Sequence, residues 1–508
     1  MRFSTAPHNP NANHKTPKLH LISLGCTKNL VDSEVMLGRL SKLELTNEPQ
    51  EADVVIVNTC GFIHSAKQES VANILRVAKE RKNGAILVVS GCLSERYASE
   101  LASEIPEIDI IIGVRDYDKI DSLLAKKGFS FLSEVKIPFT NLTPKNTKSK
   151  KTQITPFVNQ HFSTPSNTPN QNLITQNHAS QNLTNNIFSS NNKVFLSDEH
   201  SKRIISNSAI HAYIKLSEGC NQNCSFCAIP NFKGRLQSRS IASVLTEVEN
   251  LAKCGYKDFS FIAQDSSSYL LDFGIKDGLI SLIKALDSSG VARSARIHYL
   301  YPTTTSYKLV ETIADSAVVQ NYFDMPIQHI NEQMLKIMKR GSGAKKLKEL
   351  LSLMRSIPNA FLRSTIIIGH PNEGEVEFSE LSDFIAEGIF DRLNLFAFSS
   401  EEGTLSHTMK PKIPTKVVNA RLNALNKILK SQDKIRYNAL IGEKIPVIVE
   451  GRASISEHFY SARDIRWGLE IDGEILINQS EVENLGIGYY NAQITQYKQG
   501  LLFGKIIS

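Results

Sequence analysis

The sequence predicts an α/β protein with three parts: an N-terminal doubly wound parallel sheet, a central barrel of βα units, complete or partial, and a small C-terminal β-barrel. Short continuous apolar runs alternate with helical patterns over residues 18–130 and again over residues 208–430, which predicts the first two parts. The last 70 or so residues switch to short strands and turns, which predicts the third. With 508 residues, of which 41% are hydrophobic and 21% charged, the chain can form such cores, and wholesale disorder is excluded.

The N-terminal domain, residues 17–132, is predicted from apolar runs that are continuous rather than alternating, as is typical of strands buried on both faces of a parallel sheet. The runs cover residues 19–24, 54–57, 86–89 and 108–112, with helical patterns at 32–43 and 65–82. A cysteine follows each of the first three runs: Cys26, Cys60 and Cys92. Because the carboxyl ends of parallel strands share one edge of a sheet, we expect these three thiols to lie close together.

Residues 133–205 differ in composition from their surroundings. They are rich in Asn, Ser, Thr and Gln and poor in large apolar residues, so they cannot bury enough surface to offset the entropy of ordering. Most of the chain's net charge of +7 lies here. The segment is interpreted as a solvated low-complexity insertion or linker; the alternative is a basic tether for RNA.

The central domain, residues 206–436, carries six predicted βα units, with chemistry expected at the carboxyl ends of the strands. The strands are predicted at 212–216, 259–263, 295–300, 322–327, 362–368 and 393–398, and the helices include 241–253, 279–286, 332–339 and 375–386. A long helix over 415–438 leads into the C-terminal domain, residues 437–508. Predicted strands at 444–450, 475–478, 489–495 and 502–507 suit a small β-barrel.

Three further cysteines form the strongest chemical motif. Cys220, Cys224 and Cys227 stand in a C-x3-C-x2-C spacing directly after the first central strand. Three thiolates on a tight loop can hold three irons of a [4Fe–4S] cluster and leave the fourth iron open to a substrate or cofactor. The alternative of a structural zinc ion needs a fourth close ligand, and the next cysteine, Cys254, is more than twenty residues away. Cys254 itself is interpreted as structural.

Composition also restricts the setting. No apolar run reaches 18 residues and the N-terminus has no apolar segment typical of a secretion signal, so we expect a cytoplasmic protein without a membrane anchor. In that compartment seven cysteines are not a disulfide framework. The mild positive charge permits a nucleic-acid or ribosomal partner without requiring one.

The cysteine motifs and their surroundings resemble the radical S-adenosylmethionine methylthiotransferase family. The segment SEGCNQNCSFCAIPNFKGRLQSRS, from Ser217, is similar to the radical S-adenosylmethionine motif of that family. SLGCTKNLVDSE, VNTCGFIHSAKQES and GCLSERY are similar to its N-terminal domain, and the C-terminal barrel looks like a TRAM domain. The resemblance covers all but the first 17 residues and the Asn-rich insertion, and it implies a partial TIM-like radical S-adenosylmethionine barrel.

Two branches of the family differ in substrate. The tRNA branch typically has Gln-Met-Asn or a similar string after the first cysteine, where this chain has Thr27-Lys28-Asn29. QDSSSY from Gln264, DMPIQH from Asp324 and ARDIRWGLEIDG from Ala462 resemble the RimO branch instead. The Gly468-Leu469 pair departs from the usual pattern, and we expect it to affect the surface of the C-terminal barrel rather than the chemistry.

The resemblance implies two [4Fe–4S] clusters and S-adenosylmethionine, used both as methyl donor and as radical source. It assigns Cys220, Cys224 and Cys227 to the radical cluster and Cys26, Cys60 and Cys92 to an auxiliary cluster that carries the sulfur. Gln264, Arg363 and Gly369 are candidate S-adenosylmethionine contacts, and no catalytic residue is expected beyond the clusters. The implied reaction adds a methylthio group to the β-carbon of an aspartate in small-subunit ribosomal protein S-twelve, free or in the ribosomal subunit, with electrons from an unidentified donor.

Two other functions are weighed against this one: tRNA adenine methylthiolation by the same chemistry, and a non-enzymatic iron–sulfur carrier, which predicts no barrel. The charge of the C-terminal domain favours a protein substrate. Residues 437–508 contain six basic and nine acidic residues. An acidic barrel is a poor surface for a phosphate backbone and suits a basic ribosomal protein.

Overall fold

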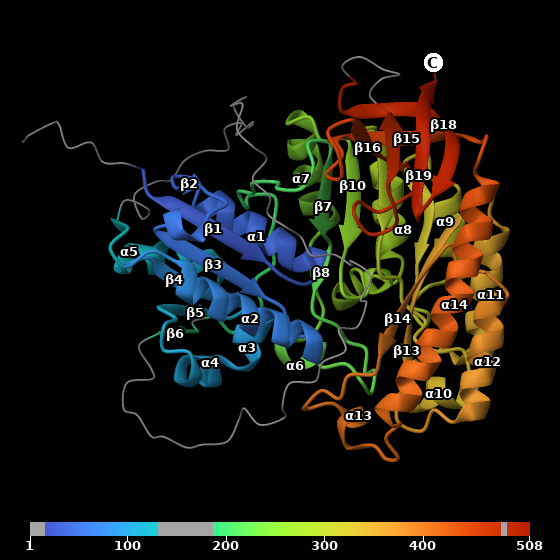
Figure 1. The fold of residues 1–508 in the computed structure, drawn as a ribbon, viewed down its shortest axis with the longest axis horizontal. Coiled ribbons are helices and arrows are strands. Elements are labelled where there is room, and N and C mark those ends of the chain that lie inside the picture. The colour runs from blue at the N-terminus through green and yellow to red at the C-terminus, as the bar shows by residue number, and fades with distance from the viewer. Residues whose placement is uncertain (1–15, 131–185, 190, 479–484, 508) are drawn as a thin grey trace, which may run out of the picture.

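The computed structural model describes residues 16–130, 186–189, 191–478 and 485–507. Figure 1 shows an N-terminal α/β domain beside a larger central domain, with a small β-barrel packed against one end of the central strands. Within the described ranges, no helix is long and apolar enough to cross a membrane.

The N-terminal sheet is all parallel, with the order β2-β1-β3-β4-β5-β6. Its strands are β1 (Lys18–Ser23), β2 (Glu44–Leu45), β3 (Val54–Thr59), β4 (Ile86–Gly91), β5 (Ile110–Ile112) and β6 (Ile187–Phe188), and its helices are α1 (Thr27–Arg39), α2 (His64–Glu80), α3 (Cys92–Arg96), α4 (Ala98–Glu104) and α5 (Ile120–Lys126). Side chains of α1 and α5 pack on one face and those of α2 and α4 on the other. The doubly wound fold is therefore confirmed, and two short edge strands are added to it.

Part of the segment with linker composition belongs to this domain. The two-residue strand β6 extends the sheet beside β5, and Val194 is buried in the core. Arg203 forms buried ion pairs with Glu34 of α1 at 2.7 Å and Glu247 at 2.5 Å. The prediction of a solvated insertion therefore does not hold for β6, Val194 and Arg203, which have specific partners in the folded domains. Residues 133–185 and residue 190 of that segment lie outside the described residues.

The central domain is one parallel sheet in the order β14-β13-β12-β11-β10-β7, so the barrel is partial rather than closed. The strands are β7 (His211–Lys215), β10 (Asp258–Ile262), β11 (Ser294–Ile297), β12 (Val319–Asp324), β13 (Phe361–Ile368) and β14 (Arg392–Ala397). The helices are α6 (Ile229–Lys233), α7 (Ile241–Lys253), α8 (Gly278–Ser289), α9 (Tyr307–Ala314), α10 (Glu332–Ile337), α11 (Gly343–Ser356), α12 (Glu375–Ala386), α13 (Leu405–Thr408) and α14 (Thr415–Ala439), and β8 (Ser217–Glu218) pairs with β9 (Gln237–Ser238). The six predicted βα units are confirmed.

The C-terminal domain is a closed barrel in the order β15-β16-β17-β19-β18. Its strands are β15 (Lys444–Arg452), β16 (Phe459–Asp464), β17 (Ile475–Asn478), β18 (Gly488–Lys498) and β19 (Leu501–Ile507). The sequence does not predict β16, which carries the buried Arg463. This guanidinium pairs with Asp258 at the start of β10, at 2.5 Å, and so fixes the barrel to the amino-terminal end of the central strands.

The loop after β16 inserts into the central domain. Leu469 is buried and its carbonyl oxygen accepts a hydrogen bond of 3.2 Å from the hydroxyl of Tyr213 on β7. Asp472 is buried as well and lies 3.2 Å from Arg363 of β13. The expectation that the Gly468-Leu469 pair affects only the barrel surface is wrong, since the loop that carries the pair is buried against Tyr213 and Arg363 of the central domain.

Candidate active site

The first three cysteines lie at one edge of the N-terminal sheet. Cys26 precedes α1, Cys60 follows β3, and Cys92 begins α3 after β4, and the strands before them are neighbours. Glycines let the loops pack tightly: a Cβ on Gly25 would lie 2.6 Å from the Cβ of Cys60, and one on Gly61 would lie 2.8 Å from the backbone of Cys92. The sheet and the two glycines together bring the thiols to one edge.

The second trio lies on the loop between β8 and α6. The backbone N–H of Cys227 donates to the carbonyl oxygen of Cys224 at 3.1 Å, and the N–H of Gln222 lies 3.4 Å from the sulfur of Cys220. Two side chains from other loops approach Cys224: the guanidinium of Arg340 and the hydroxyl of Tyr301, each 3.4 Å from the sulfur.

Both trios line the same cavity. It has a volume of about 420 Å³, within the usual range for small-molecule sites, and it lies where the two sheets face each other. All six cysteines contribute to its wall, together with aromatic and aliphatic side chains from both domains. The apolar part of the wall includes Phe62, Ile63, Phe226, Ile229, Phe232 and Phe396.

The thiols are mostly shielded from water. Burial raises the pKa of Cys92, Cys220 and Cys227 to about 12, and it raises the pKa of Cys60 as well. Such thiols keep their protons at neutral pH, so ligation to a metal must release protons. In the described part of the chain, no three Cys, His, Asp or Glu side chains converge as for a single metal ion; the six thiols are spread around the cavity instead.

A buried ion network joins the two domains beside the cavity. Lys215 of β7 lies 2.5 Å from Asp32 of α1 and 2.6 Å from Glu218 of β8, and all three side chains are fully buried. Lys233 of α6, which lines the cavity, lies 3.5 Å from Glu218. Burial alone would lower the pKa of Lys233, but the charge of Glu218 raises it above its usual value, so Lys233 is a cation at neutral pH.

Two of the three candidate S-adenosylmethionine contacts lie in the cavity wall. Gln264 donates to Glu218 at 2.6 Å, and its Oε1 atom is buried without a hydrogen-bond partner among the described residues. Arg363 also lines the cavity and pairs with Asp324 at 3.1 Å. Both positions agree with a role in ligand binding.

Gly369 does not line the cavity. Its N–H donates to Glu373 at 2.8 Å, and a Cβ on it would lie 2.3 Å from Val418 of α14. The neighbouring His370 packs edge-on against Phe226, which does line the cavity. The glycine is therefore needed to let α14 pack on the turn after β13, and its approach to the cofactor stays a prediction.

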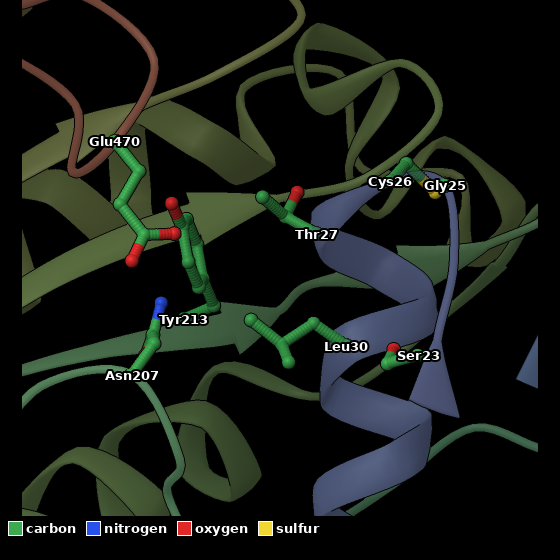
Figure 2. A pocket seen from close by; sticks show the side chains of 8 residues that line it. All are labelled: Ser23, Gly25, Cys26, Thr27, Leu30, Asn207, Tyr213 and Glu470. Carbon is green, nitrogen blue, oxygen red and sulfur yellow. The ribbon is translucent and has the colours of Figure 1, made fainter. Parts of the chain in front are cut away.

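Cys26 lies where all three domains meet. Figure 2 shows it at the N-terminal end of α1, with Thr27 and Leu30 of that helix extending toward Tyr213 and Glu470 of the C-terminal domain pointing toward the same tyrosine. Leu30 of α1 packs in one apolar cluster with Tyr213. The position of the first cysteine therefore depends on the docking of all three domains.

Known proteins share this architecture. Residues 18–113 match the model of the Uncharacterized protein family UPF0004, and residues 214–385 match the Radical SAM superfamily. Ribosomal protein uS12 methylthiotransferase RimO of Helicobacter hepaticus is 51% identical over 497 residues, covering 96% of this chain and 98% of that protein. RimO of Wolinella succinogenes is 52% identical over 480 residues, covering 94% of this chain and 96% of its own. The chain belongs to the RimO family of methylthiotransferases.

Membership in the RimO family makes the chain a transferase, and the Radical SAM match implies S-adenosylmethionine and a [4Fe–4S] cluster as cofactors. A solved structure, the radical S-adenosylmethionine methyltransferase TsrM from Kitasatospora setae, covers 75% of this chain and 72% of its own at 14% identity and a TM-score of 0.45. We draw nothing from so distant a likeness.

Three polar residues of the RimO-family site were not singled out from the sequence: Lys28, Tyr301 and Arg340. Tyr301 and Arg340 reach Cys224 from separate loops, so no sequence spacing connects them to it. Lys28 stands two residues after Cys26, inside a string that already resembled the family, and its position in that string was the available signal.

Proposed function

We propose that this chain replaces a C–H bond at the β-carbon of an aspartate in ribosomal protein uS12 with a methylthio group, using two [4Fe–4S] clusters. One observation carries the proposal: all six cysteines of the two trios line a single cavity between the N-terminal and central domains. Two sites that face one cavity allow one substrate atom to meet both without leaving the protein.

Each trio supplies three thiolates, the number that holds a cubane with one open iron. Cys220, Cys224 and Cys227 would hold one cluster and Cys26, Cys60 and Cys92 the other, and the seventh cysteine, Cys254, ends α7 and does not line the cavity. When bound, the first cluster with one S-adenosylmethionine would supply a radical able to remove a hydrogen atom, the second cluster would supply the sulfur, and a further S-adenosylmethionine would supply the methyl group.

The chain's own residues provide binding, orientation and a water-poor site. The guanidinium of Arg340 and the hydroxyl of Tyr301 contact the sulfur of Cys224 and help to hold it in place. The unpartnered Oε1 of Gln264 can accept a hydrogen bond from the ammonium or a hydroxyl of S-adenosylmethionine, and Arg363 places a cation on the same wall. The apolar side chains from both domains exclude water, which protects a reactive radical from side reactions.

Protein purified and reconstituted without oxygen is expected to bind about eight irons per chain, because each trio holds one four-iron cluster. The Cys60→Ala variant is expected to bind about four. Iron and sulfide analysis measures both. Wild-type protein with about four irons, or with bound zinc, would contradict the two-cluster proposal.

The substrate is tested by mass spectrometry of ribosomal proteins and of tRNA from cells with and without the gene. We expect uS12 to lose a methylthio group on an aspartate when the gene is absent, with tRNA unchanged. Loss of methylthioadenine from tRNA, with uS12 unchanged, would assign the enzyme to an RNA substrate instead.

A further inference from the structure

Lys28 carries a positive charge into the cavity between the two cysteine trios. It is the second residue of α1, two positions after Cys26, and its side chain lines the cavity. Its Nζ atom lies 4.0 Å from the centre of the Tyr299 ring and 3.3 Å from the carbonyl oxygen of Ala263. Both partners belong to the central domain and follow the carboxyl ends of β10 and β11. The Lys28 side chain therefore extends from the helix beside the auxiliary trio to the carboxyl ends of the central strands.

Lys28 differs from Lys233 and Arg363 in the wall, because its observed partners are neutral. Lys233 lies near Glu218 and Arg363 pairs with Asp324. Arg340 also has neutral partners, but it contacts the sulfur of Cys224 in the other trio and the carbonyl oxygen of Pro326. Among the described residues, no carboxylate lies within 4.0 Å of the Lys28 ammonium. A carbonyl oxygen and an aromatic face stabilise a cation only partly, so a charged partner of opposite sign gains a strong hydrogen bond here.

We propose that Lys28 binds the side-chain carboxylate of the substrate aspartate and so positions its β-carbon between the two trios. This inference rests on the proposed function, since that reaction brings an aspartate into the cavity. The carboxyl carbon of aspartate is bonded directly to the β-carbon, so a fixed carboxylate leaves the reacting atom little freedom. Reactions that need two groups at one atom depend strongly on such positioning.

The same contact makes the site selective for charge. An ammonium group only donates hydrogen bonds and carries a full charge, so it prefers a carboxylate to the neutral amide of asparagine. Lys28 is a positioning and specificity-determining residue in this scheme.

The test compares wild-type enzyme with Lys28→Met, which keeps the length of the side chain and removes its charge. The substrates are purified uS12 and a uS12 variant with asparagine at the modified position. We expect kcat/KM for the aspartate substrate to fall about 10- to 100-fold and the preference for aspartate over asparagine to be lost. Lys28→Arg is expected to keep the preference, and Lys79→Met, at an exposed position of α2, is expected to behave as wild type.

Two further measurements separate the substrate from the cofactor, because S-adenosylmethionine also has a carboxylate. In Lys28→Met we expect the iron content, the rate of 5′-deoxyadenosine formation without uS12 and the KM for S-adenosylmethionine to be unchanged. A raised KM for S-adenosylmethionine with an unchanged preference would assign Lys28 to the cofactor and overturn the inference. If Lys28→Met lost iron, Lys28→Gln would carry the same comparison.

An active wild type whose preference for aspartate survives in Lys28→Met would overturn this inference alone. A wild type that leaves the aspartate of uS12 unmodified would overturn the proposed function, and this inference with it.

Discussion

Replacing Cys224 with alanine is expected to abolish reductive cleavage of S-adenosylmethionine, whereas replacing Cys60 is expected to leave 5′-deoxyadenosine formation intact and to stop methylthio transfer. The two thiols belong to different domains although they line one cavity. Loss of one thiolate ligand removes the cluster held by that trio and leaves the ligands of the other in place.

The measurement is anaerobic assay of both variants with S-adenosylmethionine and uS12, followed by quantification of 5′-deoxyadenosine and of the methylthio product. Cys254→Ala is the matched control: this cysteine ends α7 and does not line the cavity, so both products are expected at wild-type levels. If the Cys224 and Cys60 variants lost the same products, the division of roles between the two trios would be wrong.

Sequence patterns predict the arrangement of the sheets because most of the strands that form them are short, continuous apolar runs separated by helical patterns. The parallel order of β1, β3 and β4 then placed Cys26, Cys60 and Cys92 at one edge without any knowledge of their side chains. No sequence pattern predicts that both trios line one cavity, because this depends on how the N-terminal domain docks on β7.

The errors lie where tertiary contacts override local pattern. Strand β6 is two residues long in an Asn-rich segment, and only its pairing with β5 makes it a strand. Strand β16 carries Arg463, and an arginine in a short strand favours an exposed position. The side chain is buried because it pairs with Asp258 of the central domain.

The charge of the C-terminal domain depends on which of its groups reach the surface. Arg463 and Asp472 are buried against Asp258 and Arg363 of the central domain. This burial removes one charge of each sign from the barrel surface, so its net charge stays acidic, which favours a protein substrate. Lys28 distinguishes between the substrate classes more directly than the net charge does, because its ammonium group lies in the wall of the cavity where the substrate would react.

The second large effect is expected at Gly25. It has a φ of +87°, and a Cβ there would lie 2.6 Å from the Cβ and 2.8 Å from the sulfur of Cys60. Cys60 cannot easily move away, because its N–H donates to the Ser70 hydroxyl at 3.0 Å and its carbonyl accepts from the same group at 2.9 Å. Gly25→Ala therefore has to separate the two loops that carry Cys26 and Cys60.

We expect Gly25→Ala to lose methylthio transfer by about 100-fold or more, since small displacements in a reacting site have effects of this size. Its iron content is expected to fall from about eight toward about four per chain, with 5′-deoxyadenosine formation retained.

Gly84→Ala is the matched control: Gly84 has a φ of +81°, but a Cβ there meets nothing within 4 Å. It carries a similar backbone strain of about 1–2 kcal/mol without the clash, so its stability is expected to fall while its activity stays at the wild-type level. Equal losses of activity in the two variants would show that strain in the backbone, rather than contact with Cys60, is what the glycine relieves.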